Sequence, residues 1–198
     1  MRNLILASSI AFALSAAGPA FAQQAQTPRP PAMTLTIPGF PDGGTIPVEF
    51  TQAAKGAAPG GGTSPEMSWE NAPEGTESFV LHVHDLDVAR NNTTEDQLHW
   101  LVWNIPATAN GLPQGVPKGS SMADGSYQTS ASGPVYRGPG APAGGPPHHY
   151  VFELYALDTM LDVKPSDDAF ENRRFVLEAI QGHVIGKASY VGLFKRPE

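Results

Sequence analysis

Polar side chains at the ends of alternating apolar runs are the residues of this sequence that could bind a small ligand. Residues 78–85 alternate with the period of a β-strand, which places Asp85 on the face of Phe79, Leu81 and Val83. A carboxylate in this place can hold a neighbouring imidazole in its charged form. Asp85 is therefore the first polar group of a candidate pocket.

A second alternating run, residues 98–105, carries an imidazole near its start. The alternation of a strand puts His99 on the face of Leu101, Trp103 and Ile105. His99 is then expected at the end of a row that faces the core.

The third run supplies two hydrogen-bond donors. Residues 150–157 alternate with Tyr150 on the core-facing side, and His148 precedes Tyr150 in phase. His148 directly follows a loop at 133–147 that is rich in Gly and Pro, a composition that restricts the backbone and permits close approach. Because three runs each end on a polar group, we expect a small polar pocket at one end of a sheet.

A metal site is the alternative use of the histidines. His82-x-His84 places two imidazoles on one strand face, a spacing that β-sandwich zinc and copper sites use. The pair resembles the His-Val-His core of copper/zinc superoxide dismutases, but the Cys residues and flanking glycines of those enzymes are missing. Further ligands could come from His99, His148, His149 and His183. A half-exposed sheet face for His82 and His84 is the simpler interpretation, so we assign no metal and no cofactor.

Composition excludes several classes of function. The 198 residues have a formal net charge of −7, which argues against binding to the phosphate backbone of nucleic acids. The absence of Cys excludes disulfides, thiolate zinc sites and Cys nucleophiles. No Ser occupies a Gly-x-Ser-x-Gly turn, and we assign no catalytic residue. With 40% hydrophobic residues, a single domain with a real core is expected, and 21 Gly and 20 Pro shape its loops.

The first 22 residues have the pattern of a signal peptide. A positive start precedes an apolar run at 4–17, and residues 20–22 form a small-x-small cleavage site. The run is shorter than the roughly 20 residues that span a bilayer. We expect a cleaved, exported protein, periplasmic or secreted, without stable membrane insertion. A flexible Pro-rich leader at 23–32 and one domain at 33–198 would remain.

Short alternating runs bounded by Gly, Pro, Asn and Asp predict a mainly β protein. The expected strands cover residues 33–37, 46–50, 78–85, 98–105, 150–157 and 189–194. One helix is expected from about Asp168 to Gln181, capped by Ser166 or Asp167 and stopped by Gly182.

Seven short motifs occur in a specific order between roughly residues 33 and 196. They include Asp85-Leu86-Asp87, the run at 98–106, Gly140-Ala141-Pro142 and His148-His149-Tyr150. In this order the motifs resemble the phosphatidylethanolamine-binding proteins (PEBP). The resemblance is closer to the bacterial YbhB/YbcL branch, also called Raf kinase inhibitor-like proteins.

The resemblance implies a β-sandwich of two antiparallel sheets, with short peripheral helices and an anion pocket at one end. It assigns ligand-binding roles by motif to Asp85, Asp87, His99, Gly140, Pro142, His148 and Tyr150. The implied partner is a small anionic or phosphorylated ligand, with a phospholipid head group as one candidate, and the implied protein binds without catalysing a reaction. A homodimer is also implied, whereas no protein partner can be named.

The motifs depart from the family pattern around this pocket. Leu86 and Val88-Ala89 replace prolines in the Asp-x-Asp motif, Ala141 replaces a loop proline, and His149 stands where Arg is usual. Gln97-Leu98 replaces an aromatic pair before the pocket His. We therefore expect a less rigid rim.

Two imidazoles, a phenol and the Gly140 N–H are the expected donors to the anion. Asp85 is expected to hold His99 or His148 as a protonated or correctly oriented donor, and affinity for the anion should fall as pH rises through the raised pKa of that His. Two other functions stay open: a regulatory module of the Raf kinase inhibitor-like type for a protein partner, and an acid/base enzyme that uses Asp85, His99 and His148.

Overall fold

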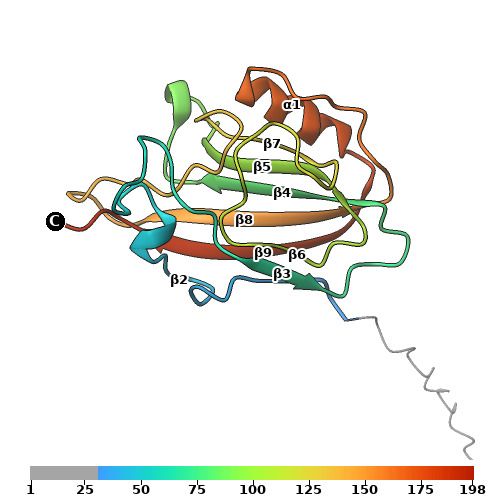
Figure 1. The fold of residues 1–198 in the computed structure, drawn as a ribbon, viewed down its shortest axis with the longest axis horizontal. Coiled ribbons are helices and arrows are strands. Elements are labelled where there is room, and N and C mark those ends of the chain that lie inside the picture. Colours follow the sequence, from blue (N-terminus) through green and yellow to red (C-terminus); the bar gives the residue numbers. More distant parts are fainter. Residues whose placement is uncertain (1–30) are drawn as a thin grey trace, which may run out of the picture. The chain divides into compact units, whose positions relative to one another are not determined.

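The computed structural model describes residues 31–198, whose strands form two sheets (Figure 1). The larger sheet contains, in spatial order, β2 (Gly44–Thr45), β9 (Val184–Phe194), β8 (His148–Leu157), β4 (Ser78–Asp85), β5 (Gln97–Pro106) and β7 (Tyr127–Thr129). The smaller sheet contains β1 (Thr34–Thr36), β3 (Met67–Glu70) and β6 (Gly111–Leu112). Two 3₁₀ turns, η1 (Val48–Phe50) and η2 (Arg90–Asn92), and one helix, α1 (Ala169–Ala179), complete the elements of this part of the chain.

All strand pairs are antiparallel except β2 with β9, which is parallel. The mainly β fold of two sheets that the sequence predicts is confirmed. The predicted signal peptide and most of the leader lie outside the described residues. No helix within residues 31–198 has the length and apolar character needed to cross a membrane.

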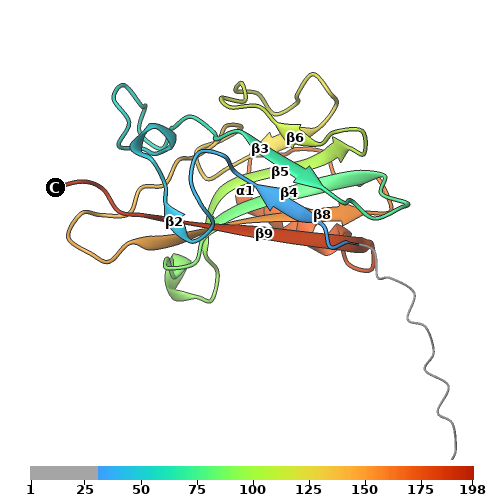
Figure 2. The ribbon, with the colours of Figure 1, turned by 90° about the horizontal axis from the view of Figure 1, so that it is seen from below.

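Both faces of the larger sheet carry a hydrophobic cluster. Phe79 and Leu81 of β4 share one cluster with Trp69 of β3, whereas Val80 shares the other with Val176 of α1. Strand β1 also contacts β9 (Figure 2), so the smaller sheet covers one face and α1 covers the opposite one. The alternation predicted for residues 78–85 is therefore correct. Because the side chains of β4 alternate between the two faces, the larger sheet packs between the smaller sheet and α1.

The helix begins at a different cap from the predicted ones. The carboxylate of Asp168 accepts hydrogen bonds from the N–H groups of Phe170 and Glu171, at 2.8 and 3.1 Å. Asp168 is thus the N-cap, because it stands directly before the first helical residue and reaches the free N–H groups of the first turn. The predicted caps Ser166 and Asp167 were two residues and one residue too early.

The strand predicted at 46–50 is wrong. Pro47 has a φ of −58° and leads into the 3₁₀ turn η1 instead of continuing the ladder of β2. A proline has no N–H for a strand partner, which explains why the pairing with β9 stops before it.

Two irregularities in β5 break the alternation predicted for residues 98–105. At the first, Val83 pairs with Trp100 while His84 pairs with Leu98, so that His99 is an extra residue. Such a β-bulge turns the side chains that follow it to the opposite faces.

The bulge changes the face on which His99 lies. Leu101 and Trp103 belong to the cluster under α1, whereas His99 packs edge-on against Tyr150, which belongs to the other cluster. A second register shift returns Ile105 to the cluster of Tyr150. The prediction that His99 shares a face with Leu101 and Trp103 is therefore wrong, although His99 still reaches the end of the sheet.

Asn104 lies in the second irregularity of β5. Replacing Asn104 by Ala should destabilise the protein by about 2 kcal/mol. Asn104 is buried and has a φ of 57°. Its side chain donates to the Leu161 carbonyl at 2.9 Å and accepts from the Leu161 N–H at 2.8 Å. Alanine would leave both backbone groups unpartnered and would disfavour the positive φ. Urea unfolding monitored by circular dichroism measures the loss.

Asn71→Ala is the matched control, because Asn71 has a φ of 58° but is exposed. Its loss of stability measures the cost of the positive φ alone, without the loss of buried hydrogen bonds. Equal losses in the two variants would show that the bonds to Leu161 contribute nothing.

Candidate functional site

A cavity of about 360 Å³ lies at one end of the central strands of the larger sheet. Six of the seven residues predicted to bind the ligand line it: Asp85, His99, Gly140, Pro142, His148 and Tyr150. The cavity is also lined by Gln52, Val88, Gln97, Arg137, Ala141 and Arg196. The fold thus brings residues of β4, β5, β8 and the Gly/Pro loop to one place.

Asp85 and His148 form the central pair of the cavity. Strands β4 and β8 are antiparallel neighbours with Asp85 opposite Tyr150, so the end of β4 meets the start of β8. Asp85 Oδ2 lies 2.8 Å from His148 Nδ1. The carboxylate is buried, and its other oxygen accepts from the Asp87 N–H at 3.0 Å. Asp85 therefore orients His148 and leaves the Nε2 atom of His148 for another partner.

His99 is a neutral imidazole in this site. Its Nδ1 lies 2.8 Å from the carbonyl oxygen of Arg137, an arrangement in which Nδ1 carries the hydrogen. Burial lowers the pKa of His99 to about 4 and outweighs the opposing effects of the carbonyl and of Asp85. Asp85 thus pairs with His148, and the prediction that it could hold His99 in the protonated form is wrong.

Tyr150 fixes the Gly/Pro loop. Its hydroxyl oxygen accepts hydrogen bonds from the N–H groups of Gly140 and Ala141, each at 3.1 Å. The Gly140 N–H, predicted as a donor to the anion, is therefore already used. Burial raises the pKa of Tyr150 above its ordinary value, so the phenol keeps a hydrogen that it can donate.

Arg137 is a cavity residue that the sequence reasoning missed. Its Nη1 donates to the Ser132 hydroxyl at 2.7 Å, but its Nε is buried without a hydrogen-bond partner. Within residues 31–198, no carboxylate forms an ion pair with this side chain. Burial lowers the pKa of Arg137 from its ordinary value, yet a guanidinium stays charged at neutral pH. No motif signals this residue, because it lies in an irregular loop ahead of Gly140.

Asp87 lies at the rim and not in the lining. It accepts the backbone N–H of His149 at 2.6 Å and lies 3.0 Å from His149 Nδ1. These bonds hold the pKa of Asp87 below its ordinary value, although burial acts in the opposite direction. Single oxygen or nitrogen atoms of Asp85, Asp87 and His148 all lie within 4.8 Å of one another.

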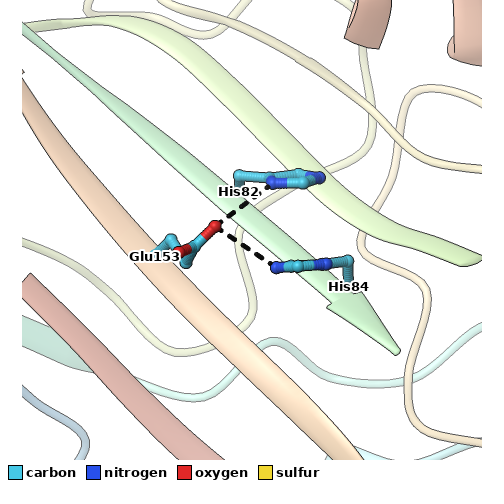
Figure 3. A group of neighbouring side chains, drawn as sticks. All are labelled: His82, His84 and Glu153. Carbon is cyan, nitrogen blue, oxygen red and sulfur yellow. Dashed lines mark ion pairs between the residues drawn. The ribbon is translucent and has the colours of Figure 1, made fainter. Parts of the chain in front are cut away.

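A second polar cluster lies on the face of the larger sheet that α1 covers. His82 and His84 are buried, and their rings stack with centroids 4.2 Å apart (Figure 3). Glu153 Oε2 lies 3.8 Å from His82 Nδ1 and 3.3 Å from His84 Nε2. The half-exposed position expected for both histidines is therefore wrong, because α1 and the loop before β5 cover this face.

The charges around this cluster shift its pKa values. Burial lowers the pKa of His82. Burial also opposes the charge of His84, but contacts with Asp96 and Glu153 outweigh it and raise the pKa of His84 to about 9. The two imidazoles, together with Lys187, hold the pKa of Glu153 far below its ordinary value. This face of the sheet thus holds a dense network of acids and bases.

Comparison with known proteins gives a consistent result. A family model described as phosphatidylethanolamine-binding protein matches residues 36–195. A UPF0098 protein of Methanothermobacter thermautotrophicus is 39% identical over 166 residues, which are 83% of this chain and 99% of the relative. The UPF0098 protein YbcL of Escherichia coli is 41% identical over 105 residues, or 50% of this chain and 55% of that protein.

Solved structures agree with the sequence comparisons. The crystal structure of YbcL from E. coli, described as a member of the mammalian PEBP family, has a TM-score of 0.68 and 25% identity. It covers 84% of this chain and 100% of its own. A PEBP homologue from Chlamydia trachomatis also has a TM-score of 0.68, with 27% identity over 84% of this chain and 99% of its own.

Proposed function

Because the chain belongs to the phosphatidylethanolamine-binding protein family, we propose that it binds a small anionic or phosphorylated ligand in the cavity beside Asp85 and His148. A phosphate group would receive hydrogen bonds from the guanidinium of Arg137, the imidazole of His148 and the hydroxyl of Tyr150. Arg137, His148 and Tyr150 all belong to the residues that line the cavity. Charge-assisted hydrogen bonds of this kind are the strong ones in anion recognition.

The unpartnered Nε of Arg137 is the observation that carries this proposal. A buried donor without an acceptor costs free energy, and an anion in the cavity would remove that cost. A phosphate oxygen is the acceptor that a guanidinium matches best.

The charge of the lining also favours an anion. Asp85 is the one carboxylate among the lining residues in the described part of the chain, and it is already paired with His148. Arg137 and Arg196 add two guanidiniums. The cavity therefore has a positive balance in a chain with a formal net charge of −7.

Calorimetric titration with inorganic phosphate and with phosphorylethanolamine tests the proposal. We expect saturable binding of at least one of them, and His148→Ala should weaken it about tenfold because one donor is lost. A stronger response to phosphorylethanolamine would favour a head group over free phosphate. Absence of saturable heat with both compounds would contradict the proposal.

His149→Ala is the matched control for this titration. His149 is the next residue along β8, but it is exposed and bonds to Asp87 outside the lining. Its loss should leave the affinity within about twofold. An equal weakening in the two variants would show that the anion does not bind in the cavity that His148 lines.

A further inference from the structure

The cluster of His82, His84 and Glu153 is separate from the anion cavity, since none of the three lines it. His82 and His84 point from the same face of β4, and Glu153 stands directly opposite His82 on β8. Figure 3 shows the carboxylate turned toward both rings. Backbone pairing therefore fixes two imidazoles and one carboxylate at adjoining positions on one sheet face.

Two ring nitrogens in this cluster have no hydrogen-bond partner. His82 Nε2 and His84 Nε2 are both buried and unpartnered, and their side chains are only 6% and 10% exposed. His84 Nε2 lies near Glu153, but it is not aligned for a hydrogen bond. Buried polar atoms normally have partners, so these two need an explanation. We propose that His82, His84 and Glu153 bind a divalent transition-metal ion, and that Zn²⁺ is the ion they fit best.

The donor set and its spacing fit zinc. Two imidazole nitrogens and one carboxylate, with a fourth position for water, form a common Zn²⁺ site. Bonds of roughly 2.0–2.1 Å around a tetrahedral ion place neighbouring donor atoms about 3.3–3.4 Å apart. Glu153 Oε2 lies 3.3 Å from His84 Nε2, which matches this spacing, and 3.8 Å from His82 Nδ1, which has to move closer for the ion to bind.

Binding requires a local turn of the rings. The two imidazoles are nearly parallel, at 10°, so their lone pairs do not yet converge on one point. A rotation of His82 toward His84 would bring them together. No hydrogen bond to His82 Nε2 opposes that rotation.

Surrounding groups would hold the ligands in place. Asp96 bonds to His84 Nδ1, which leaves Nε2 for the ion once the proton that the raised pKa of His84 keeps there is released. Tyr155 donates to Glu153 Oε2 at 2.7 Å, and Lys187 lies 2.6 Å from Oε1. Metal-binding imidazoles and carboxylates commonly have such outer partners.

The neighbouring cations are already paired. Lys187 contacts Oε1 of Glu153 and leaves Oε2 to the imidazoles, and Arg173 pairs with Asp96 at 2.6 Å. Neither side chain therefore occupies the position between the three proposed ligands.

An ion can reach the cluster from a second cavity. A cavity of about 550 Å³ between α1 and the loop before β5 is lined by His82 and Asp96. It gives the fourth coordination position a connection to water. An entry path is a requirement for any metal site.

Titration of the chelator-treated protein with Zn²⁺ tests the proposal. We expect one saturable equivalent per chain, and His82→Gln and Glu153→Gln should each weaken binding at least about 100-fold. His148→Ala is the matched control, because His148 belongs to the other cluster that could hold an ion, with Asp85 and Asp87. It should leave zinc binding unchanged. Circular dichroism shows whether each variant is folded.

X-ray absorption of the zinc-loaded wild-type protein gives an answer that does not depend on the variants. The proposed site has two imidazole ligands, whereas the cluster at Asp85 has one. A spectrum with one imidazole, or loss of binding only in His148→Ala, would overturn the proposal. Absence of saturable zinc binding would also overturn it, and a proton shared by His84, Asp96 and Glu153 would then account for the contacts.

Discussion

Arg137→Gln is expected to lower the affinity for phosphate about 100-fold, the largest effect of any single change in the cavity. Among the cavity residues in the described part of the chain, Arg137 is the half-buried cation whose Nε atom is buried without a hydrogen-bond partner. Glutamine keeps a polar, though shorter, side chain and removes the charge and the planar set of donors. Calorimetric titration with phosphate measures the change, and the fold is checked by thermal unfolding.

Two control variants separate charge from geometry. Arg196→Gln removes a guanidinium that also lines the cavity but is exposed, so it should weaken binding by less than about fivefold. Arg137→Lys keeps the charge without the planar fork and should give an intermediate affinity. If Arg196→Gln costs as much as Arg137→Gln, general attraction and not a specific contact governs binding.

His99→Gln should make the protein more resistant to acid. The pKa of His99 is lowered to about 4, against an ordinary value of 6.5. Between these values the unfolded chain binds a proton at this residue and the folded protein does not. The free energy of unfolding therefore falls as pH falls through this window. The stability that comes from keeping His99 neutral is fully present only above pH 6.5. At pH 4.5 this loss amounts to roughly 2–3 kcal/mol.

Urea unfolding at pH 7.5 and pH 4.5 measures this effect. Wild-type protein should lose roughly 2–3 kcal/mol more than His99→Gln between the two conditions. Other groups, including Asp96 and Glu153, have lowered pKa values and also cost stability in acid, but they are common to both proteins. Parallel losses in the two proteins would show that His99 is not the titrating group.

The alternation of apolar and polar residues predicts the bounds and faces of a strand correctly where the strand is regular. Residues 78–85 alternate without interruption, and β4 has the predicted bounds and faces. Strand β5 was found but its faces were not, because a bulge depends on how the partner strand pairs with it. The short strands β3, β6 and β7 have two to four residues, too few for a period to be recognised.

Motifs located most residues of the cavity proposed to bind an anion, but not Arg137. Asp85, His148 and Tyr150 lie in or beside regular strands, and their motifs have a fixed spacing. Arg137 reaches the cavity through an irregular loop, whose path no local pattern determines. Glu153 was also missed, since its meeting with His82 depends on β4 and β8 being neighbours in the sheet.

The pairing of β4 with β8 also determines when the cavity can form during folding. Asp85 and His148 are 63 residues apart in the chain, and β4 gains its second neighbour only when the intervening segment closes. Closing such a long loop costs chain entropy before any contact compensates, which slows folding compared with local hairpins. Strands β8 and β9 also pair across the segment at 158–183, which contains α1, and a chain that ends before β8 leaves one side of β4 unpaired and the cavity without His148. The cavity proposed to bind the ligand is thus complete only after β8 has joined the central sheet.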